Sequence, residues 1–534
     1  MCKPCTLIIN NIVLPLDASF KEAFSVAGAK LRRLGFSTAD LTYSIYRRSI
    51  DARKKDNIKF VYSVSACGSF SDRDLELAKS SGVTVLKDEP IDFKPCASND
   101  SDPICVVGSG PCGLFCALTL AEYGYKVILL ERGDSIQKRN IAVERFKKER
   151  VLDTNSNIQF GAGGAGTFSD GKLITRINDA MSGYVLKKFV QFGAPADILY
   201  QAKPHIGTDI LSQIVDAMLT RITELGSRVM YNTTFLDFTE SMGKISAVRT
   251  NKGDISCSAL VLAIGHSARD TYERLIAKSI DIVAKDFSVG MRIEHRTEII
   301  DSGMYGKFAG HKSLGHAEYA LSYDTARRGV YTFCMCPGGV VVPAASELGG
   351  VVVNGMSYHK RDGRNSNSAL CCSIFRDDYG ATPLKAIEFQ RGIERAAFLA
   401  AGSDYSAPYI TVGDFISDEC KTLPSDIQPT YMDGEGLRLV SPDKYLPKVV
   451  IESIKGGILD FDRKIKGFAT RSAVLTGPET RTSAPVRILR DASTRLCNGY
   501  TNLYPSGEGA GYAGGITSAA IDGIKTAIAI MNNR

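Results

Sequence analysis

The chain has 534 residues, of which 44% are apolar and 23% are charged, and this composition excludes a disordered chain or a collagen-like repeat. No run approaches the roughly 18 to 20 uncharged apolar residues that are needed to cross a bilayer, so we expect no membrane span. Lysine and arginine exceed aspartate and glutamate, 65 to 58. This mild basic excess favours anionic ligands without indicating a nucleic acid partner.

The sequence begins MCKPCTLIINNIVLPLD, which has no basic segment before a long apolar stretch and no A-x-A cleavage motif. We therefore expect no secretory signal. The 14 cysteines are then expected to be thiols in a cytoplasmic protein. Their spacing is not typical of a zinc site, so no metal is predicted.

Residues 1–98 are predicted to form a separate module. Hydrophobic periodicity predicts strands over 6–14, 41–50, 58–65 and 83–87 and helices over 19–34 and 71–78. The resulting order, βαββαβ, is that of the ferredoxin-like arrangement. A polar, proline-flanked stretch at 95–103 is the expected linker.

The segment from Arg47 to Lys55 concentrates five basic residues. It has two interpretations that the sequence leaves open. One is a solvated hairpin, and the other is a patch that docks a polyanion or an acidic partner.

A glycine motif follows the linker. The apolar strand 104–107 runs directly into Gly108-Ser109-Gly110-Pro111-Cys112-Gly113, a helix follows, and a second strand at 126–130 ends in Glu131. A G-x-G-x-x-G motif in this strand–turn–helix–strand setting, with an acid about 20 residues on, is typical of a dinucleotide site. The glycines allow a tight turn and a close approach of the backbone to a pyrophosphate, and the helix N-terminus favours its charge. Glu131 is placed to accept hydrogen bonds from the adenosine ribose.

Three further segments favour FAD over NAD. The strand 258–266 ends in small residues, like the A-T-G strand that lies against the nucleotide in FAD folds of the glutathione-reductase type. The stretch 503–516 resembles the second FAD motif, in which a Gly-acid pair reaches the ribityl chain and a helix N-terminus faces the flavin pyrimidine. The glycine run 161–172 stands where related folds wrap the flavin. Besides the motif residues Gly108, Gly110, Pro111, Cys112, Gly113 and Glu131, the predicted cofactor-binding residues are Arg132, Gly163, Gly164, Gly166, Thr167, Lys172, Ala263, Gly265, Gly507, Glu508, Gly515 and Ile516.

Long strings along the chain resemble a known family. GSGPCGLFCAL, FGAGGAGTFSDGKL, KPHIGTD, LAIGHSARDT, VGMRIEH, YTFCMCPGG, NGMS, ETRTSAPVRI and YPSGEGAGYAGGITSAAIDG are together similar to the bacterial family of uncharacterised FAD-dependent dehydrogenases. The resemblance implies a ferredoxin-like module ahead of a flavin domain. More distantly, the layout resembles geranylgeranyl reductases and para-hydroxybenzoate hydroxylase, which place a β-rich substrate domain over the flavin.

The predicted architecture is therefore α/β. It combines the module at 1–98, a Rossmann-like FAD-binding domain of the glutathione-reductase type at 103–285 and 475–534, and an inserted α+β substrate domain at 286–474. Within this insertion we expect strands at 288–293, 329–335, 339–342 and 351–353 and a helix at 386–400.

Three residues of the substrate side are candidate catalytic groups. Cys334 and Cys336 stand two apart on a predicted strand and would face the same side. They are either small packing residues or a thiol pair that relays electrons or attacks a substrate. Arg481 either holds a substrate carboxylate or phosphate as a bidentate donor or forms an ion pair with Glu479.

The function predicted from the sequence is an FAD-dependent oxidoreductase. A hydride would move between flavin N5 and a small or lipid-like organic substrate. The chain shows one dinucleotide site, so NAD(P)H or a protein electron donor would bind transiently. The alternative is a flavin-containing RNA-modifying or RNA-binding protein that uses the basic hairpin, although the strands lack the aromatic signature of common RNA-binding modules.

Overall fold

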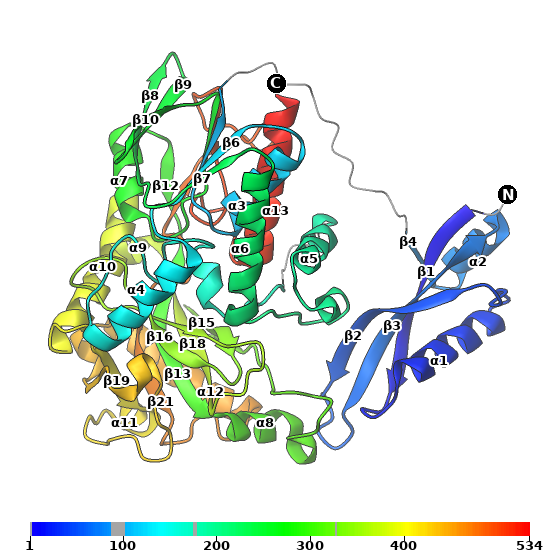
Figure 1. Cartoon of the computed structure of the whole chain (residues 1–534). Coiled ribbons are helices and arrows are strands. Elements are labelled where there is room, and N and C mark those ends of the chain that lie inside the picture. The colour runs from blue at the N-terminus through cyan, green and yellow to red at the C-terminus, as the bar shows by residue number, and fades with distance from the viewer. Residues whose placement is uncertain (1–2, 87–101, 175–178, 326–327, 534) are drawn as a thin grey trace.

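The computed structural model describes residues 3–86, 102–174, 179–325 and 328–533. The fold consists of three parts (Figure 1). Most of the expected linker, residues 95–101, lies outside the described residues.

The N-terminal part is a four-stranded antiparallel sheet with the strand order β2-β3-β1-β4 and two helices. Ser19 and Glu22 exchange the reciprocal hydrogen bonds of a capping box at the start of its first helix. The six elements follow the order expected from the sequence. They are β1 (Lys3–Leu14), α1 (Phe20–Arg33), β2 (Thr42–Asp51), β3 (Lys59–Phe70), α2 (Asp72–Ser80) and β4 (Thr84–Leu86).

The second part is built on a five-stranded parallel sheet with the order β23-β11-β5-β6-β7. Its strands are continuous apolar runs because both faces are covered. The sheet strands are β5 (Ile104–Val107), β6 (Val127–Leu130), β7 (Arg228–Met230), β11 (Ala259–Leu262) and β23 (Leu503–Pro505). β11 lies between β5 and β23, so the two ends of this domain meet in one sheet.

Helices α3 (Pro111–Glu122), α6 (Thr208–Glu224) and α13 (Ile516–Asn532) lie side by side on one face of this sheet (Figure 1). The other face carries an antiparallel meander and α7. These elements are β8 (Phe235–Ser241), β9 (Lys244–Thr250), β10 (Gly253–Ser256) and α7 (Arg269–Ala277). Between β6 and α6 lie α4 (Ile136–Glu149), η1 (Ala165–Phe168), α5 (Met181–Gln191) and η2 (Ala196–Leu199).

The third part is a seven-stranded sheet with the order β14-β15-β18-β13-β21-β19-β20. The strands are β13 (Phe287–Arg296), β14 (Ser322–Asp324), β15 (Gly329–Cys336), β18 (Asn365–Ile374), β19 (Ala407–Thr411), β20 (Leu437–Leu439) and β21 (Val474–Glu479). Two two-stranded sheets accompany it: β16 (Val340–Pro343) with β17 (Val353–Met356), and β12 (Ile282–Ala284) with β22 (Val486–Ile488). Its helices are α8 (Thr297–Tyr305), α9 (Arg376–Tyr379), α10 (Pro383–Ala400), α11 (Val412–Ser417) and α12 (Lys448–Lys464), and its short 3-10 turns are η3 (Gly306–Phe308), η4 (Tyr431–Gly434) and η5 (Pro442–Lys444).

The β2–β3 hairpin joins the N-terminal part to the rest of the chain. The Arg48 amide donates to the Tyr200 carbonyl at 2.7 Å, and the Ala202 amide donates to the Arg48 carbonyl at 2.9 Å. The Lys55 ammonium donates to the Gly303 carbonyl of α8. Arg48 and Lys55 therefore contact the rest of the chain, and Arg53 binds Asp51 within the hairpin at 2.6 Å. The tip from Arg53 to Lys55 is exposed, so both interpretations of the basic segment stay open. Among the described helices, none is long and apolar enough to cross a membrane.

Candidate functional site

The glycine turn connects β5 to α3 as the sequence predicted. Gly108 has φ +97°, which favours glycine, and a Cβ there would overlap the Ala263 carbonyl. A Cβ on Gly113 would overlap the Gly108 carbonyl, so the helix sits directly against the turn. Gly110 is the N-cap of α3, and a Cβ there would meet only the Gly164 Cα, at 3.8 Å. The helix N-terminus is thus positioned to receive an anion.

Glu131 ends β6 and is buried beside this turn. Its carboxylate accepts from the Ser109 hydroxyl at 2.6 Å and from the amides of Ser109, Gly133 and Gly161 at 3.1, 2.9 and 3.0 Å. Glu131 therefore links the glycine turn to the glycine loop that follows. A bound ribose would donate to carboxylate oxygens that already accept hydrogen bonds from the protein.

Arg132, the next residue, is directed to other protein groups. Its guanidinium hydrogen-bonds both oxygens of Asp270 and lies 4.4 Å from the centroid of the Phe160 ring. These contacts occupy the side chain that the sequence assigned to the cofactor.

Arg139 on α4 was missed by the sequence interpretation. It is fully buried and donates to the carbonyls of Asn157, Ile158 and Ala162 at 2.9, 2.9 and 2.7 Å. Burial lowers the pKa of its guanidinium to about 9. The only signal in the sequence was an arginine on the apolar face of an amphipathic helix, and its effect is to shape the backbone of the glycine loop.

The glycine loop 161–173 contacts both other predicted cofactor segments. Gly164 packs against Gly110, and a Cβ on Gly166 would lie 3.3 Å from Ile516 and 3.4 Å from Pro111. The Thr167 hydroxyl donates to the Ala162 carbonyl at 3.4 Å within the loop itself. At the end of the loop, the Thr517 hydroxyl donates to the Leu173 carbonyl at 2.8 Å. The starts of α3 and α13 and this loop therefore converge.

The C-terminal segment closes the same site. A Cβ on Gly507 would lie 2.7 Å from the Cys112 Cβ. Asp522 on α13 accepts from the Gly507 amide at 2.7 Å and from the Ser506 hydroxyl at 3.0 Å. Hydrogen bonds and charge from Arg490 outweigh burial and lower the pKa of Asp522 to about 2. Asp522 was also missed, since a single acid inside an apolar helix gave no motif.

The groups around Glu508 fit a bound cofactor. Its carboxyl is half-buried, and no hydrogen bond to it is found within the part of the chain that the structure describes. Burial, opposed by the charge of Lys285, raises its pKa to about 7. The backbones of Gly265, Gly514 and Gly515 border open space, because a Cβ on each would meet nothing within 4 Å. The Glu508 carboxyl can therefore accept hydrogen bonds from the hydroxyl groups of a ribityl chain. The exposed backbone of the glycines suits contact with the edge of the flavin.

Cys334 and Cys336 lie at a bulge, so the expectation of a regular strand was wrong. The register of β15 against β18 shifts between Phe333 and Cys336, and Cys334 has φ +45°. The Cys336 thiol donates to the Cys334 carbonyl at 3.3 Å. Lys172 donates to the carbonyl of Met335 and pairs with Asp170 at 2.8 Å. The structure therefore brings Lys172 to the segment that carries the two cysteines.

The two thiols differ in acidity. A hydrogen bond from Cys336 and the charges of Arg292 and Lys172 lower the pKa of Cys334 to about 6 against the effect of burial. The same hydrogen bond and burial raise the pKa of Cys336. The opposite directions of the two shifts make Cys334 the more acidic thiol of the pair.

Arg292 on β13 is fully buried behind this bulge. It binds both oxygens of Glu479 at 2.7 Å and donates to Asn367 at 2.8 Å and to the Cys334 carbonyl at 3.0 Å. The sequence interpretation had not selected it, because these partners lie on three different strands, β21, β18 and β15.

The ion pair proposed between Arg481 and Glu479 is wrong, since Glu479 binds Arg292. Arg481 instead binds both oxygens of Glu394, at 3.2 and 3.0 Å, and the Ser346 hydroxyl. Arg269 binds the same carboxylate at 2.7 and 2.8 Å. Both terminal nitrogens of Arg481 thus donate hydrogen bonds within the chain. Arg481 is therefore not available as a bidentate donor to a substrate anion.

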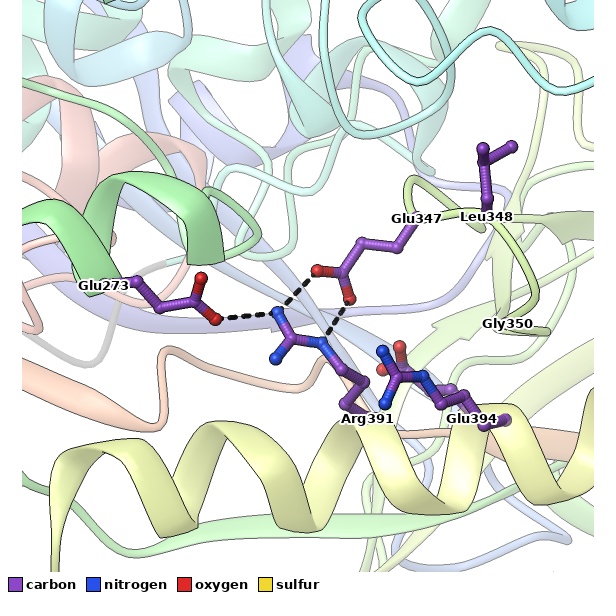
Figure 2. Close-up of a pocket in the computed structure, with 7 residues that line it drawn as sticks. Glu273, Glu347, Leu348, Gly350, Arg391 and Glu394 are labelled. Atoms are coloured by element: carbon purple, nitrogen blue, oxygen red, sulfur yellow. Dashed lines mark hydrogen bonds and ion pairs between the residues drawn. The ribbon is translucent and has the colours of Figure 1, made fainter. Parts of the chain in front are cut away.

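Glu394 also lines a cavity of about 300 Å³ between α7, α10 and the loop after β16 (Figure 2). It is lined by Glu273, Glu347, Leu348, Gly350, Arg391, Glu394 and Arg395. Arg391 points to Glu347 and Glu273, which it binds at 2.8 and 3.0 Å. The charges compensate one another, so the cavity marks an ionic contact between the second and third parts of the fold. Within the described residues, no group of three or more His, Cys, Asp or Glu is arranged to hold a metal ion.

Family comparisons agree with this geometry. Residues 286–482 match the model "FAD-dependent protein, C-terminal domain-like", residues 106–162 match "NAD(P)-binding Rossmann-like domain", and residues 7–67 match "Domain of unknown function (DUF8436)". The chain is an FAD-dependent flavoprotein of an enzyme family with a Rossmann-like FAD-binding fold. It belongs to the same family as an uncharacterised protein of Clostridium beijerinckii, which is 46% identical over 532 residues, 97% of either chain.

Solved structures resemble the chain only weakly. CtdE in complex with FAD is 11% identical over 80% of this chain and 84% of that one, with a TM-score of 0.32. Glycine oxidase from Bacillus cereus is 12% identical over 81% and 98%, with a TM-score of 0.33. Likeness at this level does not indicate a substrate.

Proposed function

We propose that the protein is an FAD-dependent oxidoreductase that transfers a hydride between flavin N5 and an organic substrate. The observation that carries the proposal is the convergence of three segments, the Gly108–Gly113 turn, the loop 161–173 and the start of α13. When bound, FAD supplies a two-electron acceptor and donor, and the protein supplies position and electrostatics.

Each segment has a task in this proposal. The start of α3 at Gly110 holds the diphosphate. Glu508 accepts a hydrogen bond from the ribityl chain. Gly515 and Ile516, at the start of α13, direct the positive end of that helix to the pyrimidine, where negative charge grows on reduction. Gly163 and the residues up to Thr167 cover the ring.

The remaining assignments are part of the same proposal. Residues 1–98 form a ferredoxin-like module, which the strand order β2-β3-β1-β4 supports. Residues 103–285 and 475–534 hold FAD, and residues 286–474 supply the pocket for a small or lipid-like substrate. NAD(P)H or a protein donor reduces the flavin transiently. Free cysteines throughout the described residues support a reducing, cytoplasmic location.

The test is the flavin itself. The purified protein is expected to be yellow, to release FAD on denaturation, and to bleach under anaerobic conditions when its physiological donor or a reduced substrate is added. A panel of reduced organic compounds, with NADH and NADPH, then defines the substrate side. Protein that stays colourless after incubation with FAD contradicts the proposal.

A further inference from the structure

We propose that Cys334 and Cys336 form a dithiol–disulfide redox centre in which Cys334 is the attacking thiolate, Cys336 is the resolving thiol, and oxidised FAD accepts the electrons. The inference rests on the proposed function, because it requires flavin beside the glycine loop. It deepens that function by adding a second two-electron centre to the same site.

The hydrogen bonds distinguish the two sulfurs. Cys336 is 0% exposed and donates its proton to the Cys334 carbonyl at 3.3 Å, so it retains that proton. Cys334 is half-buried, and its positive φ turns it out of the regular strand. A partly exposed cysteine next to a fully buried, proton-bearing one is the arrangement of an attacking and a resolving thiol.

Two cations are fixed around the pair. Arg292 reaches it from β13 and donates to the Cys334 carbonyl, and Lys172 reaches it from the glycine loop and donates to the Met335 carbonyl. Glu479 on β21 and the thiol of Cys371 on β18 face the same site and oppose a thiolate. Removing Arg292 would leave buried Glu479 without its partner. Lys172 can be replaced, because Arg361 still binds both oxygens of its partner Asp170.

The same lysine connects the pair to the cofactor segments. Lys172 precedes Leu173, whose carbonyl accepts from Thr517 in the first turn of α13. The Lys172 side chain therefore links the segment of the two cysteines to the loop that the proposed function places around the flavin.

The electron balance of the step is complete with FAD as the oxidant. The Cys334 thiolate and the Cys336 thiol form one S–S bond and give two electrons to oxidised FAD. The proton of Cys336 passes to the flavin, so that the products are the disulfide and the anionic reduced flavin. The reverse step returns the electrons to the disulfide.

The first experiment measures nucleophilicity on protein freed of flavin. The rate of iodoacetamide alkylation of each cysteine is followed against pH by peptide mass spectrometry, with exposed Cys420, whose pKa is raised, as the internal comparison. The Cys334 rate is expected to reach half its plateau near pH 6, whereas the Cys420 rate still rises above pH 8. Lys172→Gln is expected to raise the Cys334 midpoint by about half a pH unit or more. A Cys334 midpoint near that of Cys420, or no shift in Lys172→Gln, overturns the assignment of Cys334.

The second experiment counts electrons in the FAD-bound protein. After oxidation with diamide and removal of the reagent, an anaerobic dithionite titration of the wild type is expected to consume twice the reducing equivalents of Cys334→Ser or Cys336→Ser before the flavin is fully bleached. Cys420→Ser, which removes an exposed cysteine, is expected to titrate like the wild type. Equal consumption by wild type and both pair variants, with FAD bound, overturns the redox centre and leaves the proposed function intact. Failure to bind FAD defeats the proposed function itself.

Discussion

The Cys112 thiol donates a hydrogen bond to the Ser506 hydroxyl at 3.1 Å, although the two residues are 394 positions apart. Cys112 lies in the first turn of α3, and Ser506 directly follows β23. This contact brings the Gly108–Gly113 turn against the segment that leads to Glu508. The proposed function assigns the diphosphate to the turn and the ribityl chain to Glu508. The candidate site therefore needs both segments of the domain, one before and one after the inserted part.

Gly110→Ala separates cofactor binding from folding. The new Cβ would touch only the Gly164 Cα, at 3.8 Å, so the flavin-free protein is expected to keep its melting temperature within about 2 °C. The methyl group would occupy the side from which the diphosphate approaches, and we expect FAD affinity to fall at least about tenfold. Thermal melts and flavin titration check both expectations.

The matched control is Gly392→Ala in α10, where a Cβ would meet nothing within 4 Å. It is expected to leave FAD affinity unchanged and to stabilise the helix by up to about 1 kcal/mol. Equal FAD affinity for Gly110→Ala and Gly392→Ala would contradict the placement of the diphosphate at the start of α3.

The parts of the site that the sequence predicted are those fixed by local backbone. The glycine turn, its strand and its helix need only neighbouring residues, and the structure begins α3 at Pro111 as expected. The second glycine loop contacts the turn, but what shapes it was not predicted. Arg139 acts on carbonyls about 20 positions away, and nothing local marks an arginine for that task.

Partner choice among charged residues was the least predictable feature. Arg481 and Glu479 are two apart, and this closeness suggested a pair. However, β21 ends at Glu479, so the regular alternation of the strand does not extend to Arg481. Each residue finds a partner from another element, Glu394 for Arg481 and Arg292 for Glu479. A single sequence carries no record of which elements become neighbours.

Glu508→Gln is expected to have a pH-dependent effect on the stability of the flavin-free protein. The folded pKa of about 7 lies above the ordinary value of 4.5. A carboxyl with a raised pKa is most favourable below pH 4.5, and its contribution is lost as the pH rises to 7. The variant should therefore melt close to the wild type at pH 5 and above it at pH 8. Differential scanning calorimetry at both values measures this, with Glu149→Gln on α4 as the exposed control. A difference that is the same at both pH values would contradict the raised pKa of Glu508.

Glu479→Gln tests the buried pair behind the cysteines. Removing the carboxylate leaves the Arg292 charge in a site that is 0% exposed, and breaking such a pair costs about 3–5 kcal/mol of unfolding free energy. The control is Glu149→Gln, which removes the ion pair between Glu149 and Arg145. Both side chains are more than half exposed, so the expected loss of unfolding free energy is at most about 0.5 kcal/mol. Denaturant unfolding measures both, and similar losses would show that Arg292 is solvated.

Arg48→Ala tests the contact between the N-terminal part and the rest of the chain. The Arg48 guanidinium carbon lies 5.0 Å from the centroid of the Phe60 ring and 5.8 Å from that of Tyr200, and such contacts contribute about 0.5–2 kcal/mol. The Ala202 amide, bound to the Arg48 carbonyl, should then exchange its hydrogen several-fold faster. Arg47→Ala, at the exposed neighbouring position, should leave that exchange unchanged. If both variants left the Ala202 amide equally protected, the hairpin would be held by its backbone alone, and Arg48 would be free to join the other basic residues in binding a polyanion.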